Sequence, residues 1–330
     1  MRDLLGNRDE ASSARRYSVS DTGTIPDLIS PQKPVHRLGL VAAFSKAEAQ
    51  ALAVEVERYA TDRGLLLVPE NRLTPQAKDQ VDAIVVLGGD GLMMRAANSY
   101  PDVPLLGINF GHLGFLALVE QQHWQAALDA LLAGQYQIEE GSTLDAVIVR
   151  DNEQVSQGWA INDVVIRSGT RMIDLELNVG GHFVNTYPGD GLIVSTPHGS
   201  TAYCMAAGGP ILTAGVLGFA IVPISCHSPI RTPLVVSERD AIKVKLLNDR
   251  DAILILDGAE RSTMRKGDEV WVTKGLHRFC LVTFGSTNFY EAFRTKFNFA
   301  IRPNAIPAMP ERPDPVDILH APIPGKPAHD

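Results

Sequence analysis

The chain has 330 residues, of which 45% are hydrophobic and 21% charged, and its net charge at pH 7 is −8. This length suits two domains with packed cores, and the acidic balance argues against non-specific binding to nucleic acid. The sequence contains no apolar run of the roughly 20 residues that a membrane helix needs. Its three cysteines, Cys204, Cys226 and Cys280, are too widely spaced for a disulfide framework or a structural zinc site, which favours the cytoplasm.

The first part of the chain alternates between β and α patterns. Residues 1–36 are polar and contain Pro26, Pro31 and Pro34, so they predict a flexible leader without the apolar core of a signal peptide. The alternation that follows predicts an α/β domain over residues 37–139, with a Rossmann-like parallel sheet. Strands are expected at residues 38–44, 65–68, 83–87 and 105–109, and helices at residues 47–59, 92–98 and 121–132.

The third of these strands stops abruptly at Gly88, Gly89, Asp90 and Gly91. Glycines let a ligand approach the backbone closely, and the helix that follows offers free N–H groups to a phosphate. Asp90 would repel a bare phosphate, so its carboxylate should take a proton from a hydroxyl, hold a metal or bond a ribose. An aspartate that only caps the helix is the alternative. Since ligands of such sheets bind at the carboxyl ends of the strands, we expect this loop to lie beside the loop at Gly111.

From about residue 138 the pattern changes to short β-rich segments separated by Gly, Asn and Asp, which predicts an all-β sandwich domain over residues 140–287. Strands are expected at residues 144–150, 164–167, 175–179, 192–194, 220–224, 242–247, 252–256, 269–273 and 280–284, with one short helix at residues 201–209. A terminal helix is predicted at residues 288–300, packing back on the first domain. The eight prolines from Pro303 to Pro327 predict a disordered tail over residues 301–330.

Two further clusters could carry chemistry. Residues 190–203 concentrate hydroxyl and backbone N–H groups that could hold ribose or phosphate oxygens, and Tyr203 offers a face on which a base could stack. Ser200 or Thr201 could instead cap the helix. Asn162 and Asp163 stand at the start of a predicted strand, where an adenine amino group or a ribose diol would suit them, although a simple turn is the alternative.

Taken together, these clusters resemble the NAD kinase family, whose members transfer a phosphoryl group from ATP to the 2′-hydroxyl of the adenosine ribose of NAD. The resemblance covers roughly residues 38–296. It rests on the Gly-Gly-Asp-Gly at residues 88–91, the Gly-x-Asn-x-Gly-x-x-Gly-Phe at 107–115, the pair at 162–163, and the long motif at 190–203. The first motif alone is shared with diacylglycerol kinases, sphingosine kinases and phosphofructokinases, whereas the last is very specific.

The resemblance implies a role for each matching residue. Asp90 would be the general base, and Gly88, Gly89 and Gly91 would let the donor phosphates approach. The remaining residues would form the dinucleotide site: Phe115, Asn162, Asp163, Asp190, His198, Thr201, Ala202 and Tyr203. ATP would bring Mg²⁺ or another divalent cation, and we assign no metal ligand to the protein itself. The resemblance also implies a homodimer or homotetramer.

Three positions depart from the family's usual pattern. His198 stands where Ser or Thr is common, Thr232 separates Arg231 from Pro233, and Ala259 replaces a frequent Gln. These departures motivate one rival reading, a non-catalytic dinucleotide-binding sensor. The enzyme rival is a lipid kinase of the diacylglycerol or sphingosine type. A Walker lysine loop, a G-x-S-x-G elbow and a G-x-G-x-x-G fingerprint are absent, which argues against P-loop enzymes, serine hydrolases and dehydrogenase-like NAD binding.

Overall fold

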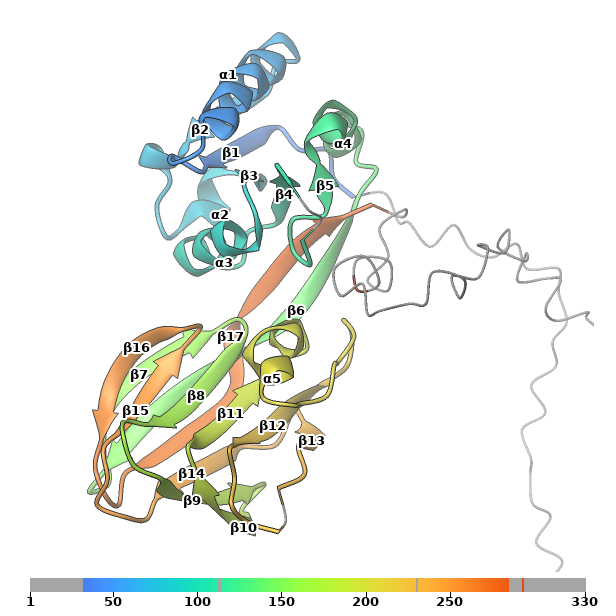
Figure 1. Ribbon diagram of the computed structural model, residues 1–330. Helices are drawn as coiled ribbons and strands as arrows, with labels where there is room; N and C mark the ends of the chain where they lie inside the picture. Colours follow the sequence, from blue (N-terminus) through green and yellow to red (C-terminus); the bar gives the residue numbers. More distant parts are fainter. Residues whose placement is uncertain (1–31, 112–113, 230, 285–292, 294–330) are drawn as a thin grey trace, which may run out of the picture.

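The computed structural model describes residues 32–111, 114–229, 231–284 and 293, and it has two halves joined by a pair of long strands (Figure 1). The amino-terminal half contains β1 (Arg37–Ala42), α1 (Ala47–Asp62), β2 (Leu66–Pro69), η1 (Glu70–Arg72), α2 (Ala77–Gln80), β3 (Ala83–Leu87), α3 (Asp90–Ser99), β4 (Leu105–Asn109), β5 (Val119–Glu120), η2 (Gln121–His123) and α4 (Trp124–Leu132).

The strands of this half form a parallel sheet in the order β2-β1-β3-β4. Every residue of β3 and β4 is buried, as expected of short apolar runs covered on both faces. Helices α1 and α4 pack on one face, and α2 and α3 pack on the other. The predicted α/β class with a Rossmann-like sheet is therefore confirmed.

The carboxyl-terminal half is almost entirely β. It contains β6 (Gln137–Arg150), β7 (Glu153–Ala160), β8 (Asp163–Ser168), β9 (Ile173–Val179), β10 (His182–Gly189), β11 (Gly191–Ser195), η3 (His198–Thr201), α5 (Tyr203–Ala206), β12 (Gly218–Ile224), β13 (Leu234–Ser237), β14 (Ile242–Leu246), β15 (Ala252–Leu256), β16 (Ala259–Met264) and β17 (Glu269–Thr283).

These strands form two packed layers, which confirms the predicted β sandwich. One layer is the sheet β13-β12-β11-β8-β15-β16, and the other contains β10, β9, β14, β17, β6 and β7. Alternate apolar residues from both layers meet in one core, for example Ile166 of β8, Leu192 of β11 and Val244 of β14. The outer face of the first layer is covered in part by α5, which buries Cys204 against Val165 and Ile193.

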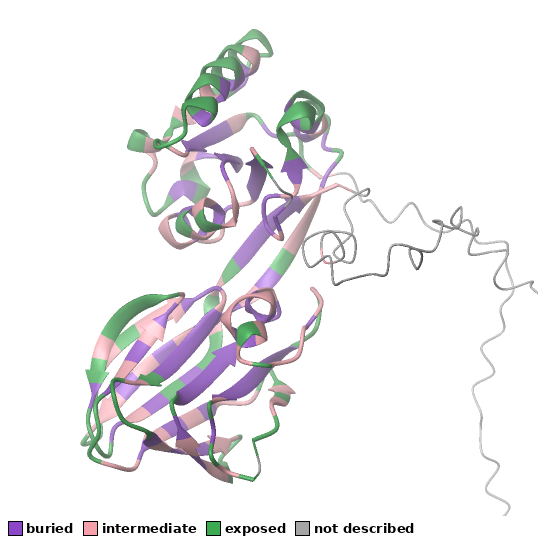
Figure 2. Cartoon of the chain, in the orientation of Figure 1, coloured by how far each residue is buried: buried purple, intermediate pink, exposed green. Residues whose placement is uncertain are grey.

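Strands β6 and β17 run through both halves of the molecule (Figure 1). The last part of β17 joins the parallel sheet, where Leu281 pairs with Leu105 of β4, and its Phe279 and Val282 lie in the cores of the first half. The boundary expected after residue 139 therefore falls inside β6. The strands predicted at 269–273 and 280–284 belong to one strand, β17, which pairs with β6 on both sides of a stretch from residue 273 to 278 that contains no buried residue (Figure 2).

Some of the predicted segments lie outside the residues that the structure describes. The leader up to residue 31, the tail over residues 301–330 and the terminal helix at 288–300, apart from Phe293, lie outside the described residues. The helix expected at residues 201–209 consists of the short η3 and α5. All three cysteines are free and buried. Across the described part of the chain, no helix is long and apolar enough to cross a membrane.

Candidate active site

Asp90 lies at the carboxyl end of β3, and its side chain bonds the loop before α3 to the loop that follows β4. It is the first residue of α3, whose N-cap position is occupied by Gly89 without a side-chain hydrogen bond, so Asp90 is not a simple helix cap. Its carboxylate instead accepts hydrogen bonds from the backbone N–H groups of Phe115, Leu116 and Ala117, at 3.0, 3.0 and 3.2 Å. These bonds fix the carboxylate against the loop that follows β4.

The glycines around Asp90 serve different purposes. At Gly89 and Gly91 an added Cβ would meet nothing within 4 Å, so the backbone there faces open space that a ligand could enter. At Gly88 it would lie 2.6 Å from Leu92, inside the turn into α3. At Gly114 it would lie 2.0 Å from an oxygen of Asp90. Gly114 is therefore required if Asp90 is to reach the neighbouring loop.

The Asn162 and Asp163 pair forms the turn between β7 and β8, and this turn is held by Asp257. The Asp257 carboxylate accepts the backbone N–H groups of Ile161, Asn162 and Asp163, at 2.8, 2.7 and 3.2 Å. Its Oδ2 also accepts a hydrogen bond of 3.3 Å from the side-chain amide of Asn98 on α3. The two halves of the molecule thus meet at this carboxylate.

Asp163 has a buried carboxyl group with a raised pKa. The residue is only 5% exposed. Burial, together with the nearby negative charge of Asp257, raises the pKa of Asp163 to about 7. A buried carboxyl group with this pKa is a candidate for binding a ligand group.

A cavity of about 450 Å³ brings several predicted residues together. It is lined by Asn162, Asp163, Val165, Arg167, Ala202, Tyr203, Ile255, Asp257 and Gly258. Thus the 162–163 pair and the end of the 190–203 motif, predicted separately, share one cavity. The cavity combines polar groups at the turn and at Arg167 with the apolar side chains of Val165 and Ile255, which suits a ligand with a base and a sugar.

Other predicted residues lie outside this cavity. Asp90 and Phe115 do not line it. Asp90 begins α3, whereas Asn98, which contacts Asp257, lies about 12 Å further along the helix axis. Asp190 is exposed and precedes Gly191, the strand partner of Arg167 at the end of β8 far from Asn162. Asp190 and the pair therefore lie at opposite ends of β11, and a place for Asp190 in the dinucleotide site stays a prediction.

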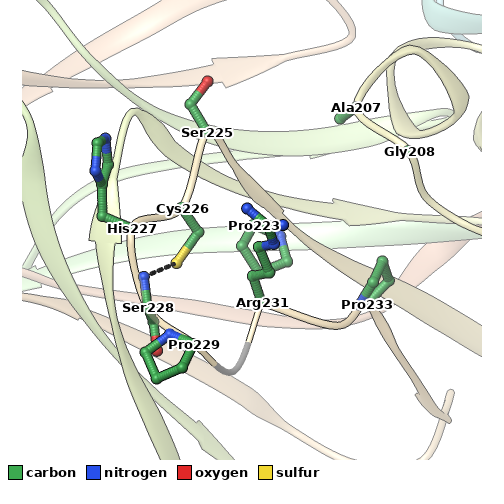
Figure 3. A pocket seen from close by; sticks show the side chains of 10 residues that line it. All are labelled: Ala207, Gly208, Pro223, Ser225, Cys226, His227, Ser228, Pro229, Arg231 and Pro233. Atoms are coloured by element: carbon green, nitrogen blue, oxygen red, sulfur yellow. Dashed lines mark hydrogen bonds between the residues drawn. The ribbon is translucent and has the colours of Figure 1, made fainter.

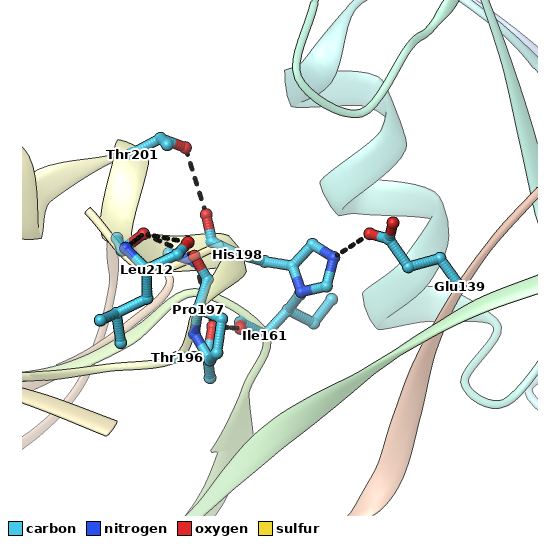
Figure 4. A network of polar contacts seen from close by, with 9 residues as sticks. Glu139, Ile161, Thr196, Pro197, His198, Thr201 and Leu212 are labelled. Carbon is cyan, nitrogen blue, oxygen red and sulfur yellow. Dashed lines mark hydrogen bonds and ion pairs between the residues drawn. The ribbon is translucent and has the colours of Figure 1, made fainter. Parts of the chain in front are cut away.

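The side chains of His198 and Thr201 also turn away from this cavity. The His198 ring points toward β6, where its Nε2 lies 3.2 Å from Glu139 (Figure 4), and it packs edge-on against Phe279 of β17 at 4.9 Å. Gly141 leaves room for the ring, since a Cβ there would lie 2.4 Å from it. Thr201 donates its hydroxyl hydrogen bond to the His198 carbonyl at 3.2 Å. The His198 side chain therefore joins the two halves, and its place in the dinucleotide site stays a prediction.

A larger cavity of about 880 Å³ lies on the carboxyl-terminal half and contains none of the predicted site residues. Its wall includes Ser225, Cys226, His227, Ser228 and Arg231 (Figure 3). The Ser228 N–H donates to the Cys226 sulfur at 3.4 Å. Arg231, one of the residues at which the sequence departs from the family pattern, is thus a cavity residue, whereas Ala259 is exposed at the start of β16.

Sequence reasoning missed the contributions of Asp257, Asn98 and Arg167. Asp257 and Gly258 have positive φ angles of 49° and 77° and form the turn between β15 and β16. An Asp-Gly pair after an apolar run is a common signal for such a turn. The partners of its carboxylate are 94 to 96 residues away along the chain, so no local pattern indicates them.

Comparisons with known proteins agree with this arrangement. Residues 68–136 match the model of the ATP-NAD kinase N-terminal domain, and residues 161–284 match that of the ATP-NAD kinase C-terminal domain. An NAD kinase from Thermomicrobium roseum is 52% identical over 272 residues, which are 82% of this chain and 94% of that relative. An NAD kinase from Natranaerobius thermophilus is 40% identical over 220 residues, 65% of this chain and 77% of the relative.

Two solved structures share the fold. Yeast NADH kinase complexed with NADH aligns with a TM-score of 0.74 and 19% identity, covering 82% of this chain and 89% of the yeast chain. An NAD kinase from Archaeoglobus fulgidus in complex with ATP aligns with a TM-score of 0.63 and 24% identity, covering 79% and 97%. From its two matching domains and its close relatives, we conclude that the chain belongs to the NAD kinase family.

Proposed function

We propose that this protein transfers the γ-phosphoryl group of ATP to the 2′-hydroxyl of the adenosine ribose of NAD, giving NADP. The observation that carries the proposal is the cavity in which Asn162 and Asp163 meet Ala202 and Tyr203. The names of the relatives, all NAD kinases, support NAD as the acceptor.

The cavity would hold the adenosine part of NAD. Tyr203 would stack on the base, because every base has a π face that an aromatic ring can cover. Asn162 and Asp163 would bond the adenine amino group or the ribose hydroxyls. An ionised Asp163 accepts such hydrogen bonds more strongly than a protonated one, so binding should improve as the pH rises through the Asp163 pKa of about 7.

Asp90 would take the proton of the 2′-hydroxyl. Its three backbone N–H bonds hold the carboxylate in one orientation, which is what a general base requires. Because Asp90 does not line the adenosine cavity, the proposal requires the ribose to extend from the cavity toward the carboxyl end of β3. The open backbone at Gly89 and Gly91 would accept the donor phosphates at the start of α3.

Mg²⁺ would accompany ATP, where it neutralises charge on the phosphates during transfer. The described residues contain no group of three or more His, Cys, Asp or Glu side chains suited to a metal ion. Magnesium usually binds through substrate phosphates and only one or two carboxylates, so the residues present fit a cation brought by the donor. We further propose a cytoplasmic enzyme, because its three free thiols suit a reducing compartment, and a homodimer or homotetramer.

The test is an assay of the purified full chain with ATP, Mg²⁺ and NAD. NADP should accumulate and be detected with an NADP-specific dehydrogenase. Phosphorylation of diacylglycerol or sphingosine without NADP would favour the lipid kinase. Binding of NAD without turnover would favour the sensor that the departures at His198, Thr232 and Ala259 suggest.

A further inference from the structure

Asp257 occupies a turn that is poorly suited to an ordinary side chain. Its φ angle is 49° and that of Gly258 is 77°, both in the left-handed region, where Asp is tolerated and most residues are strained. The turn connects β15 to β16 and places the Asp257 carboxylate beneath the turn between β7 and β8.

We propose that Asp257 is a positioning residue that sets both halves of the reaction site, by holding the Asn162 and Asp163 turn and by tethering the helix that begins with Asp90. The inference rests on the proposed function. It assigns Asp257 no contact with the reacting atoms.

The Asp257 carboxylate holds the turn between β7 and β8 through its backbone. Three consecutive N–H groups, from Ile161 to Asp163, point at the two oxygens of one carboxylate. Ile161 is 1% exposed, so its N–H has no access to water if the carboxylate is removed. The backbone of the Asn162 and Asp163 pair is thereby fixed without using either side chain, which leaves both side chains available to the dinucleotide.

Asp257 is also bonded to helix α3 of the amino-terminal half. Asn98, on the last turns of this helix, donates from its side-chain amide to Asp257 Oδ2 at 3.3 Å and to the Met94 carbonyl at 3.2 Å. The same helix starts at Asp90, and a helix transmits a shift at one end to the other because it is stiff. Asp257 therefore connects the adenosine cavity to the proposed base across the two halves of the molecule.

The third observation is electrostatic. Asp163 and Asp257 line the same cavity, and after burial the charge of Asp257 is the second cause that raises the pKa of Asp163. The other titratable or charged groups around Asp163 are Cys204 and Tyr203 of α5 and Arg167 of β8. Neutralising Asp257 removes a negative neighbour, so Asp163 should ionise at lower pH.

The test compares Asp257→Asn and Asn98→Ala with the wild-type enzyme in the NADP-forming assay. Asp257→Asn should raise KM for NAD about 10-fold to 100-fold, because an amide cannot accept all three N–H bonds and a bond to a charged group is lost. The pH at which KM for NAD improves should move below the wild-type value. Asn98→Ala keeps the turn but frees α3, so kcat should fall about 10-fold with KM for NAD nearly unchanged.

Asp82→Asn is the matched control. Asp82 also accepts two backbone N–H groups, from His36 and Arg37, but lies away from the adenosine cavity, so kcat and KM should stay within twofold of wild type. Circular dichroism and urea unfolding establish that each variant is folded. If Asp257→Asn does not fold, the kinetic constants of Asn98→Ala test the proposal alone. Wild-type values of both kcat and KM in that variant would show that Asn98 does not tether α3.

Two outcomes would overturn the proposal. One is a folded Asp257→Asn enzyme with wild-type KM and an unmoved pH dependence. The other is a folded Asn98→Ala enzyme in which kcat does not fall, whether or not KM for NAD changes. Both outcomes are interpreted only when the wild-type enzyme forms NADP in the same assay. Failure of the wild type to form NADP would instead remove the proposed function, so the two failures are distinguishable.

Discussion

Replacing Asp163 by asparagine should stabilise the protein, and the gain should grow as the pH rises. The carboxyl group is 5% exposed and has a pKa of about 7, against an ordinary value of 3.8. At about 1.4 kcal/mol per pKa unit, ionising this buried group costs the folded state up to about 4 kcal/mol.

The direction in which the free energy of unfolding changes with pH follows from the number of protons bound in the folded and the unfolded chain. Below pH 3.8 the carboxyl group is protonated in both the folded and the unfolded chain, so the raised pKa has no effect. Between pH 3.8 and about 7 only the unfolded chain has lost its proton, and the free energy of unfolding falls with pH. Above about pH 7 the full cost is present. Asparagine cannot ionise, so Asp163→Asn avoids this cost.

Urea unfolding at pH 5 and pH 8 checks the expectation. The stability of Asp163→Asn relative to wild type should be larger at pH 8 by about 2 to 3 kcal/mol. Asp82→Asn is the control, because burial of Asp82 is outweighed by the N–H groups of His36 and Arg37 and by the Arg37 guanidinium, which lower the Asp82 pKa. Its stability difference should be the same at both pH values. An equal difference for Asp163→Asn at pH 5 and pH 8 would refute the reasoning.

Asp90→Asn should lower kcat by about 10²-fold to 10⁴-fold with little change in NAD affinity, measured by NADP formation and calorimetry; unchanged turnover would remove Asp90 from the mechanism. Gly114→Ala should also lower kcat, because its Cβ would lie 2.0 Å from an Asp90 oxygen, whereas Gly169→Ala meets ordinary contacts and should not. Tyr203→Leu should raise KM for NAD by about 5-fold to 100-fold through loss of stacking, and an unchanged KM would argue against a base at Tyr203.

Much of the fold was predictable because its signals are local. The strands at 105–109 and 252–256 have the predicted bounds, since each is an apolar run ended by turn residues. Strands β7 and β16 were missed because their residues are mostly exposed and polar, so they carry no clear alternation. The continuity of β17 was missed because it depends on pairing with β6, which lies far away along the chain and holds β17 on both sides of an irregularity between Lys274 and Arg278.

For the candidate site, motifs indicated which residues gather but not how they are oriented. Asn162, Asp163, Ala202 and Tyr203 share the cavity as the sequence reasoning implied. His198 belongs to the same motif, yet its ring turns toward β6, because Gly141 and Phe279 provide a place for it there. Such an orientation depends on partners distant in sequence, which a linear motif does not contain.

The shared strand also constrains how the protein can be synthesised. Leu281 is hydrogen-bonded beside Leu105, and Val282 is buried among side chains from the first half. The amino-terminal sheet therefore lacks the strand that pairs with β4 at Leu105 until nearly all of the β domain has left the ribosome. During that interval the backbone of β4 around Leu105 has no partner on the side that β17 later occupies. A nascent chain would recruit a chaperone there or mispair with another copy.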